Sequence, residues 1–169
     1  MAISSTDVYP EYYETYISKV QEQDLLMALL KNKGDTIDLF RNVTADKEDY
    51  KYEKGKWSIK EVLQHLMDTE RVMAYRALRF SRGDDTELPG FDQDVFTKEY
   101  HLDSINLDQL IEEFISIRNS TILFYRHLSD KHLDYRGIAS GWPMSVNALL
   151  HVIVGHAEHH NRIINERYL

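Results

Sequence analysis

The chain has 169 residues, of which 43% are hydrophobic and 28% charged, which is the length and composition of one folded domain and excludes a disordered chain. Its 20 Lys and Arg against 28 Asp and Glu give a net charge of −8, which disfavours a nucleic-acid partner because phosphate backbones are also negative. The sequence has no cysteine, so disulfides, thiolate metal sites and a cysteine nucleophile are excluded, and any metal must be bound by histidines and carboxylates.

The N-terminal residues Met1–Asp7 lack a basic region followed by an apolar one, so we predict no signal peptide. The longest apolar runs, such as Leu25–Leu30, are too short to span a bilayer. We therefore expect a cytoplasmic protein without a membrane partner.

Four stretches with apolar residues at helical spacing follow an aromatic N-terminal arm at 1–11. They run from about Tyr12 to Asn42, Ser58 to Phe80, Asn106 to Leu128 and Ser145 to Tyr168. The first contains a break near Val20–Asp24. Few segments alternate with period two, so no sheet is predicted, and 1–169 is expected to form a single all-α domain, a four-helix bundle. The connection Arg82–Ile105 is too long for a hairpin, so it must cross over or cover one end of the bundle.

Two of these helices begin with capping signals. Ser58 and Glu61 have the spacing of a capping box, and Asn106 with Gln109 is a weaker version of the same cap. Trp57 comes just before the first cap, and we expect it either to pack on the first turn of the helix or simply to be buried.

Two of the eight histidines have the spacing of a metal-binding pair. His156 and His160 are four residues apart, so on a helix their Cβ atoms lie about 6 Å apart on one face and both rings can reach one metal ion. A solvated helix face is the alternative interpretation. His65, at the edge of an apolar stripe, could supply a third ligand, or it is a structural histidine. His159 belongs to the surroundings of the pair or to the surface, and His151 lies on roughly the opposite side of the helix.

Several blocks of the sequence resemble the DinB-like (DinB/YfiT) superfamily. They are Lys56–Arg71, Ala74–Phe80, Leu88–Asp92 and Gly155–His160. The resemblance implies a four-helix bundle in up-down-down-up order, often dimeric. It also implies a divalent metal held by three histidines, which by position are His65, His156 and His160. Nickel or zinc is the expected ion, with iron and manganese as alternatives.

The resemblance also suggests a class of activity. Members with assigned chemistry are thiol-dependent transferases and isomerases that use bacillithiol, mycothiol or glutathione, and others are described as metal-dependent hydrolases. We therefore expect a metal-dependent enzyme for a small-molecule substrate, in the first place an S-transferase with a low-molecular-weight thiol as cosubstrate. A hydrolase that uses metal-bound water and a non-catalytic, dimeric metal-binding stress protein are the alternatives.

Three neutral protein ligands leave a coordination position open, as in catalytic metal sites, so acid–base partners are expected nearby. Glu61 and Thr69 lie one helical turn from His65 on either side, and Arg76 lies three turns further on, which makes these three the catalytic candidates. Gly155 precedes the first histidine of the pair and either permits close approach of another helix near the metal or is incidental.

The remaining candidates concern cosubstrate binding. Arg76 and Arg79 are suited to bind the carboxylates of a low-molecular-weight thiol, whereas ion pairs with acids such as Glu70 or Asp92 are the favoured alternative. Phe91, in the long connection, either forms a wall over the site together with its neighbours or only closes the end of the bundle.

Overall fold

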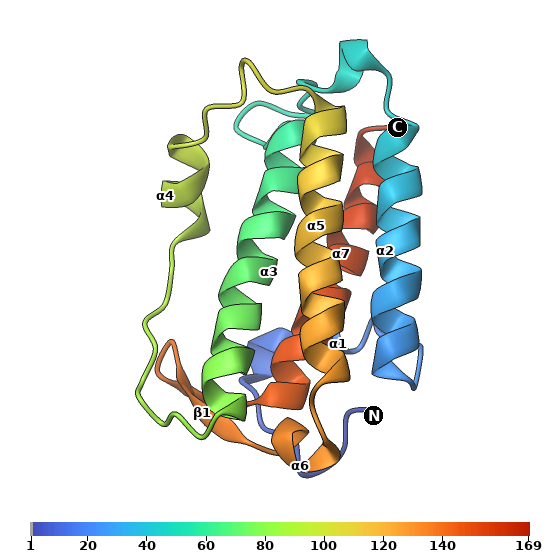
Figure 1. Cartoon of the computed structure of the whole chain (residues 1–169). Helices are drawn as coiled ribbons and strands as arrows, with labels where there is room; N and C mark the ends of the chain where they lie inside the picture. The colour runs from blue at the N-terminus through green and yellow to red at the C-terminus, as the bar shows by residue number, and fades with distance from the viewer. Residues whose placement is uncertain (1) are drawn as a thin grey trace.

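The computed structural model describes residues 2–169, and four long helices in it stand side by side (Figure 1). They are α2 (Leu25–Arg41), α3 (Ile59–Ser81), α5 (Leu107–Arg126) and α7 (Val146–Arg167). In the view of Figure 1, α2 runs up, α3 and α5 run down and α7 runs up. The predicted four-helix bundle and its up-down-down-up order are therefore confirmed.

The order of the helices explains the long connection between α3 and α5. Helix α2 packs on α5 and α7, and α3 packs on the same two helices. Since α3 and α5 are neighbours that run in the same direction, the chain must return along the whole bundle between them (Figure 1). The returning segment carries the short helix α4 (Gln93–Lys98), which contacts α3 from the outside.

The remaining helical segments are short. A 3₁₀ turn at Glu11–Tyr13 leads into α1 (Glu14–Ile17), which packs on α7, and the predicted break near Val20–Asp24 separates α1 from α2. A second 3₁₀ turn follows α2 at Ala45–Lys47, and α6 (Asp130–Leu133) follows α5. Among the described residues, no helix is long and apolar enough to cross a membrane.

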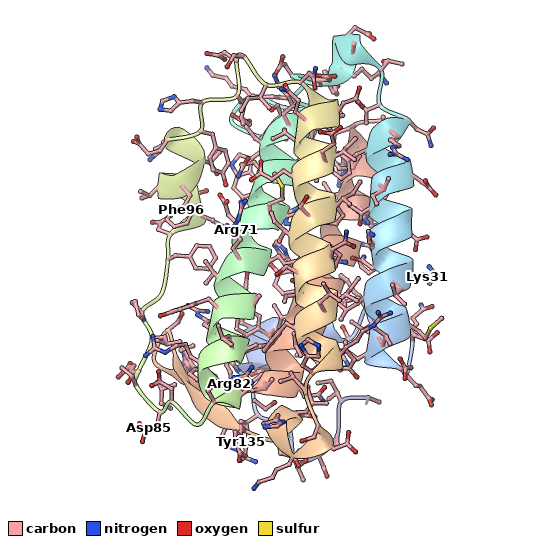
Figure 2. The ribbon with its side chains drawn as sticks, in the orientation of Figure 1. Lys31, Arg71, Arg82, Asp85, Phe96 and Tyr135 are labelled. Atoms are coloured by element: carbon pink, nitrogen blue, oxygen red, sulfur yellow. The ribbon has the colours of Figure 1, made fainter. Side chains whose placement is uncertain are left out.

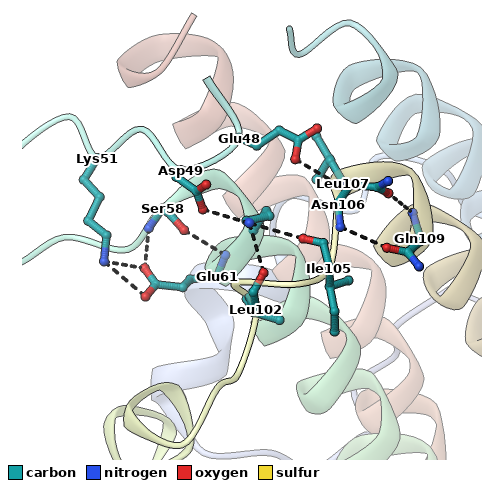
Figure 3. A network of polar contacts seen from close by, with 11 residues as sticks. Glu48, Asp49, Lys51, Ser58, Glu61, Leu102, Ile105, Asn106, Leu107 and Gln109 are labelled. Carbon is teal, nitrogen blue, oxygen red and sulfur yellow. Dashed lines mark hydrogen bonds and ion pairs between the residues drawn. The ribbon is translucent and has the colours of Figure 1, made fainter. Parts of the chain in front are cut away.

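Both predicted capping boxes are present, and they fix where two of the long helices begin. The Ser58 side chain accepts the backbone N–H of Glu61, whose carboxylate accepts the backbone N–H of Ser58 (Figure 3). Asn106 and Gln109 form the same reciprocal pair at α5 (Figure 3). Ser145 caps α7 by accepting the backbone N–H of Ala148. Each cap satisfies N–H groups that have no partner within the helix.

The prediction that the chain contains no sheet is wrong for one hairpin. Strands β1 (Arg136–Ala139) and β2 (Trp142–Ser145) pair antiparallel through a turn at Ser140–Gly141. Four-residue strands are too short for alternation to be recognised. Tertiary packing holds this hairpin, because Gly137 lies so close to the Phe80 ring that a Cβ at this position would overlap it.

Polar side chains at mid-height divide the hydrophobic core into two clusters. The cluster at the hairpin end includes Leu29, Met73 and Val152, and the cluster at the opposite end includes Phe40 and Leu63. The middle turns of the four long helices carry the buried polar residues Asn32, Thr36, Thr69, Glu70, Arg118, Thr121, His156 and Asn161. Most other polar side chains point outward, as Lys31 and Asp85 do in Figure 2. A polar layer inside a small bundle is costly unless its groups are paired or serve a function.

Candidate metal centre

Three histidines from two helices converge in this polar layer. His65 comes from α3, and His156 and His160 come from consecutive turns of α7; one ring nitrogen from each lies within 4.8 Å of the others. The Nε2 atoms of His65 and His156 are 3.0 Å apart. The centres of the three rings are 4.6–5.0 Å from one another. The structure thus brings together the three histidines predicted as metal ligands.

The distance between the His65 and His156 nitrogens suits a shared divalent ion. Metal–nitrogen bonds of about 2.0–2.1 Å place two ligand nitrogens about 2.9–3.4 Å apart at octahedral or tetrahedral angles. The 3.0 Å between His65 and His156 falls in this range, and the same spacing allows one ring to donate an N–H to the other in the metal-free protein. The donor set contains three neutral nitrogens and no carboxylate among the described residues. Nickel, zinc and iron all accept such a set.

Burial keeps all three rings neutral at ordinary pH. Removal from water lowers the pKa of His65 to about 4 and that of His160 to about 3. The pKa of His156 is held well below its usual value, first by burial and then by the neighbouring His160 and His65 rings. A neutral imidazole presents the lone pair that a metal requires, so the cluster is ready to bind an ion without first losing protons.

Two aromatic side chains enclose the cluster. The Trp57 ring lies 4.6 Å from the His65 ring and 6.3 Å from the His160 ring, centre to centre. The Tyr16 ring meets His156 edge-on at 5.2 Å and His159 at 5.4 Å. The spacing along the last helix placed His159 near the pair, but no sequence signal indicated Tyr16, because only the packing of α1 on α7 brings Tyr16 to the histidines.

Gly155 makes that packing possible. A Cβ at this position would overlap the backbone carbonyl of Tyr16, so of the two interpretations given for Gly155 the close approach of a second helix is the one confirmed, and that helix is α1. We expect Gly155→Ala to lower the free energy of unfolding by about 1–3 kcal/mol, as overpacking does, and to move Tyr16 away from the histidines. Urea unfolding measures the loss of stability, and NMR contacts between the Tyr16 and His156 rings report the movement of Tyr16.

Gly34 provides the control for this prediction. It lies within α2, where a Cβ would meet no atom within 4 Å, so Gly34→Ala is expected to stabilise the protein by about 0.5–1 kcal/mol through helix propensity alone. A Gly155→Ala protein stabilised to the same extent would contradict the close packing of α1 against α7.

A cavity of about 170 Å³ opens beside His156. Its lining includes Tyr13, Tyr16, Thr69 and Phe91. The Thr69 hydroxyl is buried and has no hydrogen-bond partner in the described part of the chain, which is a cost unless a ligand supplies one. Thr69, a predicted catalytic candidate, and Phe91, predicted either to form a wall over the site or to close the end of the bundle, thus both line a cavity beside His156.

A second cavity, of about 260 Å³, lies on the other side of the cluster, beside His160. Trp57, Lys56 and Asp94 contribute to its lining. The charge of Asp94 acts to raise the pKa of His65, against the larger effect of burial. No sequence signal indicated Asp94, because only the return of the chain through α4 brings it to the histidines.

Glu61, in contrast, does not line either cavity. Its carboxylate is occupied by the capping box with Ser58 and by an ion pair with Lys51, whose Nζ lies 2.8 Å from Oε2 (Figure 3). The predicted helix cap at Glu61 is therefore confirmed. The same cap engages the carboxylate that was expected to serve as an acid or base.

The two arginines predicted to bind a cosubstrate, Arg76 and Arg79, have different environments on α3. Arg79 forms an ion pair, as the favoured alternative predicted, but its partner is Asp84 and not Glu70 or Asp92. Arg76 is buried and forms no ion pair among the described residues, so the same expectation is wrong for it. Glu70 is paired instead with Arg118 from α5, which was not predicted because it comes from another helix.

Comparisons with known proteins agree with the fold. The sequence model of the DinB superfamily matches residues 28–164. YfiT from Bacillus subtilis, described as a probable metal-dependent hydrolase with an unusual four-helix bundle topology, superposes with a TM-score of 0.74 at 15% identity over 94% of this chain and 87% of its own. The DinB-like protein YjoA from Bacillus subtilis superposes with a TM-score of 0.60 at 17% identity, covering 83% of this chain and 87% of that one. No curated protein matches the sequence.

Proposed function

This chain belongs to the DinB superfamily, and from that premise we propose that it is a divalent-metal-dependent enzyme whose ion is held by His65, His156 and His160. The observation that carries this proposal is the convergence of three neutral imidazoles beside a cavity. Burying three imidazoles together without a ligand lowers their proton affinity and gains little stability. A shared cation accounts for both the spacing and the burial.

The residues present define what each part of the site does. A bound divalent ion supplies Lewis acidity, which lowers the pKa of a thiol or water at its open position. The three imidazoles would hold the ion, and the cavities beside His156 and His160 would give a substrate access to it. The Thr69 hydroxyl, in the first cavity, is free to donate a hydrogen bond to a substrate. Tyr16 and Trp57 restrict the access of bulk water to the cluster.

Transfer of a low-molecular-weight thiol is the reaction that the cavity beside His156 favours. Within residues 2–169, no Asp or Glu lines this cavity, so it offers no carboxylate to remove a proton from water. A thiol needs no such base, because coordination to a cation is sufficient to deprotonate it. The chain has no cysteine, so the sulfur must come from a cosubstrate.

Hydrolysis is the second candidate, and the cavity beside His160 supports it. Asp94 lines that cavity and could act as the base for an attacking water. YfiT, which shares the fold, is described as a probable metal-dependent hydrolase. The two candidates therefore depend on different sides of the same cluster.

One set of assays separates the candidates. We expect the purified protein to bind about one divalent ion per chain and to conjugate glutathione or bacillithiol to 1-chloro-2,4-dinitrobenzene. Chelation should lower this rate at least 100-fold, added metal should restore it, and Asp94→Asn should leave it unchanged. Hydrolysis of p-nitrophenyl esters without thiol, lost in Asp94→Asn, would instead establish the second candidate. Full conjugating activity without metal, or bound metal with no turnover in either assay, would refute the proposed enzyme.

A further inference from the structure

Two arginines are almost completely buried, and only one of them has a counter-ion. Arg118 and Arg76 are each 1% exposed. Arg118 contacts the Glu70 carboxylate at 2.9 Å. No carboxylate in the described part of the chain lies within ion-pair distance of Arg76. Because a guanidinium stays protonated at every pH at which proteins fold, Arg76 is a buried positive charge that the chain itself does not compensate.

The hydrogen-bond partners of Arg76 are all neutral. Its Nη2 donates to the carbonyl oxygen of Pro89 at 2.8 Å and to the hydroxyl of Ser140 at 2.9 Å. Its Nη1 contacts the sulfur of Met73 at 3.8 Å, which is a weak acceptor. These partners do not use all the N–H donors of the guanidinium. This planar group can bind an anion through two parallel hydrogen bonds.

The guanidinium lies against the wall of the cavity beside His156. Met73 and Ser140, which accept its hydrogen bonds, both line this cavity. So does Phe91, whose ring centre is 6.0 Å from the guanidinium carbon. Burial raises the pKa of Tyr13, another lining residue, and the positive charge of Arg76 and a hydrogen bond from Arg76 to the Tyr13 hydroxyl, also a neutral partner, act against that rise. The cavity therefore has His156, one of the three histidines, in its wall, and a positive charge directly behind the residues of another part of its wall.

Ser140 supports the same end of the cavity from a strained position. Its φ is 55°, in the left-handed region that favours Gly, Asn or Asp, and it is the first residue of the hairpin turn. Its oxygen accepts from Arg76, so its own hydroxyl hydrogen is available to a ligand. Residues held in such conformations are concentrated at binding and catalytic sites.

We propose that this cavity binds a small molecule through one carboxylate, with Arg76 as its counter-ion and Ser140 as a further donor, while the opposite end of the molecule faces the three histidines. The proposal rests on the proposed function only in taking this cavity as the substrate cavity. Arg76 lies eleven residues after His65, about 16 Å along the helix axis, so the carboxylate is remote from the reacting end.

The size and charge of the cavity define the ligand class. Its volume of about 170 Å³ equals that of about six liquid water molecules, which suits a short, largely unbranched molecule. A single guanidinium neutralises a monoanion, whereas a phosphate dianion would keep a buried negative charge. Met73, Val152 and Phe91 offer apolar contacts for the chain between the two ends.

Hexanoate and its neutral analogue hexanamide test the proposal. Binding to the full-length protein is followed by NMR, with and without bound divalent metal, through the Arg76 side-chain N–H and the Thr69 methyl signals. We expect hexanoate to bind roughly tenfold or more tightly than hexanamide, since a hydrogen-bonded charge pair discriminates to this extent. Arg76→Met should abolish the preference. The control Arg79→Met also removes a charge from α3, but one that is paired with Asp84, so this variant should retain the preference for hexanoate.

Arg76→Met is expected to fold, because methionine removes an uncompensated buried charge while it keeps most of the volume. Should it not fold, Ser140→Ala should weaken hexanoate binding severalfold. Equal affinities for the two probes in the wild-type protein, or a preference that persists in Arg76→Met, would overturn the proposal. If hexanoate were preferred only when metal is bound, and equally so in Arg76→Met, its carboxylate would be binding the metal. That result would also overturn the proposal. Failure of the three-histidine site is a separate result, because it appears in the metal content and not in this comparison.

Discussion

Replacing His156 by alanine is expected to reduce the bound divalent metal from about one ion per chain to almost none and to abolish the metal-dependent activity. Sites with four protein ligands bind zinc with roughly 10–16 kcal/mol, so one ligand contributes about 3 kcal/mol, which corresponds to an affinity loss of more than 100-fold. His65 and His160 would remain, but two imidazoles from different helices hold an ion weakly. Elemental analysis after gel filtration and competition with a metal indicator measure the loss.

His151 is the matched control for this variant. It lies on the same helix, is 2% exposed, and makes its hydrogen bond through Nδ1 to the carbonyl oxygen of Asn147, away from the cluster. His151→Ala should therefore lower stability without changing metal content. If the two variants retained the same amount of metal, the three-histidine site would be refuted.

Replacing Glu70 by glutamine is expected to have the largest effect on stability. Arg118 Nε contacts both oxygens of the Glu70 carboxylate, at 2.9 and 3.0 Å, and both residues are almost fully buried. Glutamine leaves the Arg118 charge uncompensated inside the bundle, which costs about 3–5 kcal/mol. For a chain of this length, this loss lowers the melting temperature by about 10 °C or more. Urea unfolding and a thermal scan measure the two effects.

An exposed ion pair and a double variant complete this test. Arg162 and Glu166 form a solvated pair at 3.1 Å, so Glu166→Gln should change the free energy of unfolding by less than about 1 kcal/mol. Replacing both buried partners, in Glu70→Leu with Arg118→Met, should recover much of the lost stability because neither position then carries a buried charge. A Glu70→Gln protein as stable as Glu166→Gln would contradict the assignment of Glu70 and Arg118 as a compensated buried pair.

The Glu70–Arg118 pair is part of a network that joins the four long helices at the level of the metal centre. Arg118 Nη1 also donates to the Asn32 side-chain oxygen at 2.6 Å, and the Asn32 amide donates to Glu158 at 3.0 Å. Glu158 lies on α7 between His156 and His160 in the sequence. The network therefore fixes α7 against α2, α3 and α5 where two of the three histidines project.

Local rules predicted the helices and two of the three histidines of the candidate metal centre. A capping box involves residues three apart, and a histidine pair on one face involves residues four apart, so Ser58 with Glu61 and His156 with His160 were recognised from spacing alone. His65 required the resemblance to the superfamily, because nothing local relates a residue on α3 to a residue 91 positions later. The four helical stretches followed from apolar periodicity for the same local reason.

The hairpin, the aromatic cover of the cluster and the partners of the buried charges were decided only in the tertiary structure. Tyr16 reaches the histidines because Gly155 lets α1 approach α7, and Asp94 reaches them because the chain must return along the bundle. Arg76 and Arg118 lie in equally buried positions on neighbouring helices, yet only Arg118 faces a carboxylate. Spacing along one helix determines which side chains share a face, whereas contacts between helices determine which of them are paired, and the energy of a buried charge depends on its pairing.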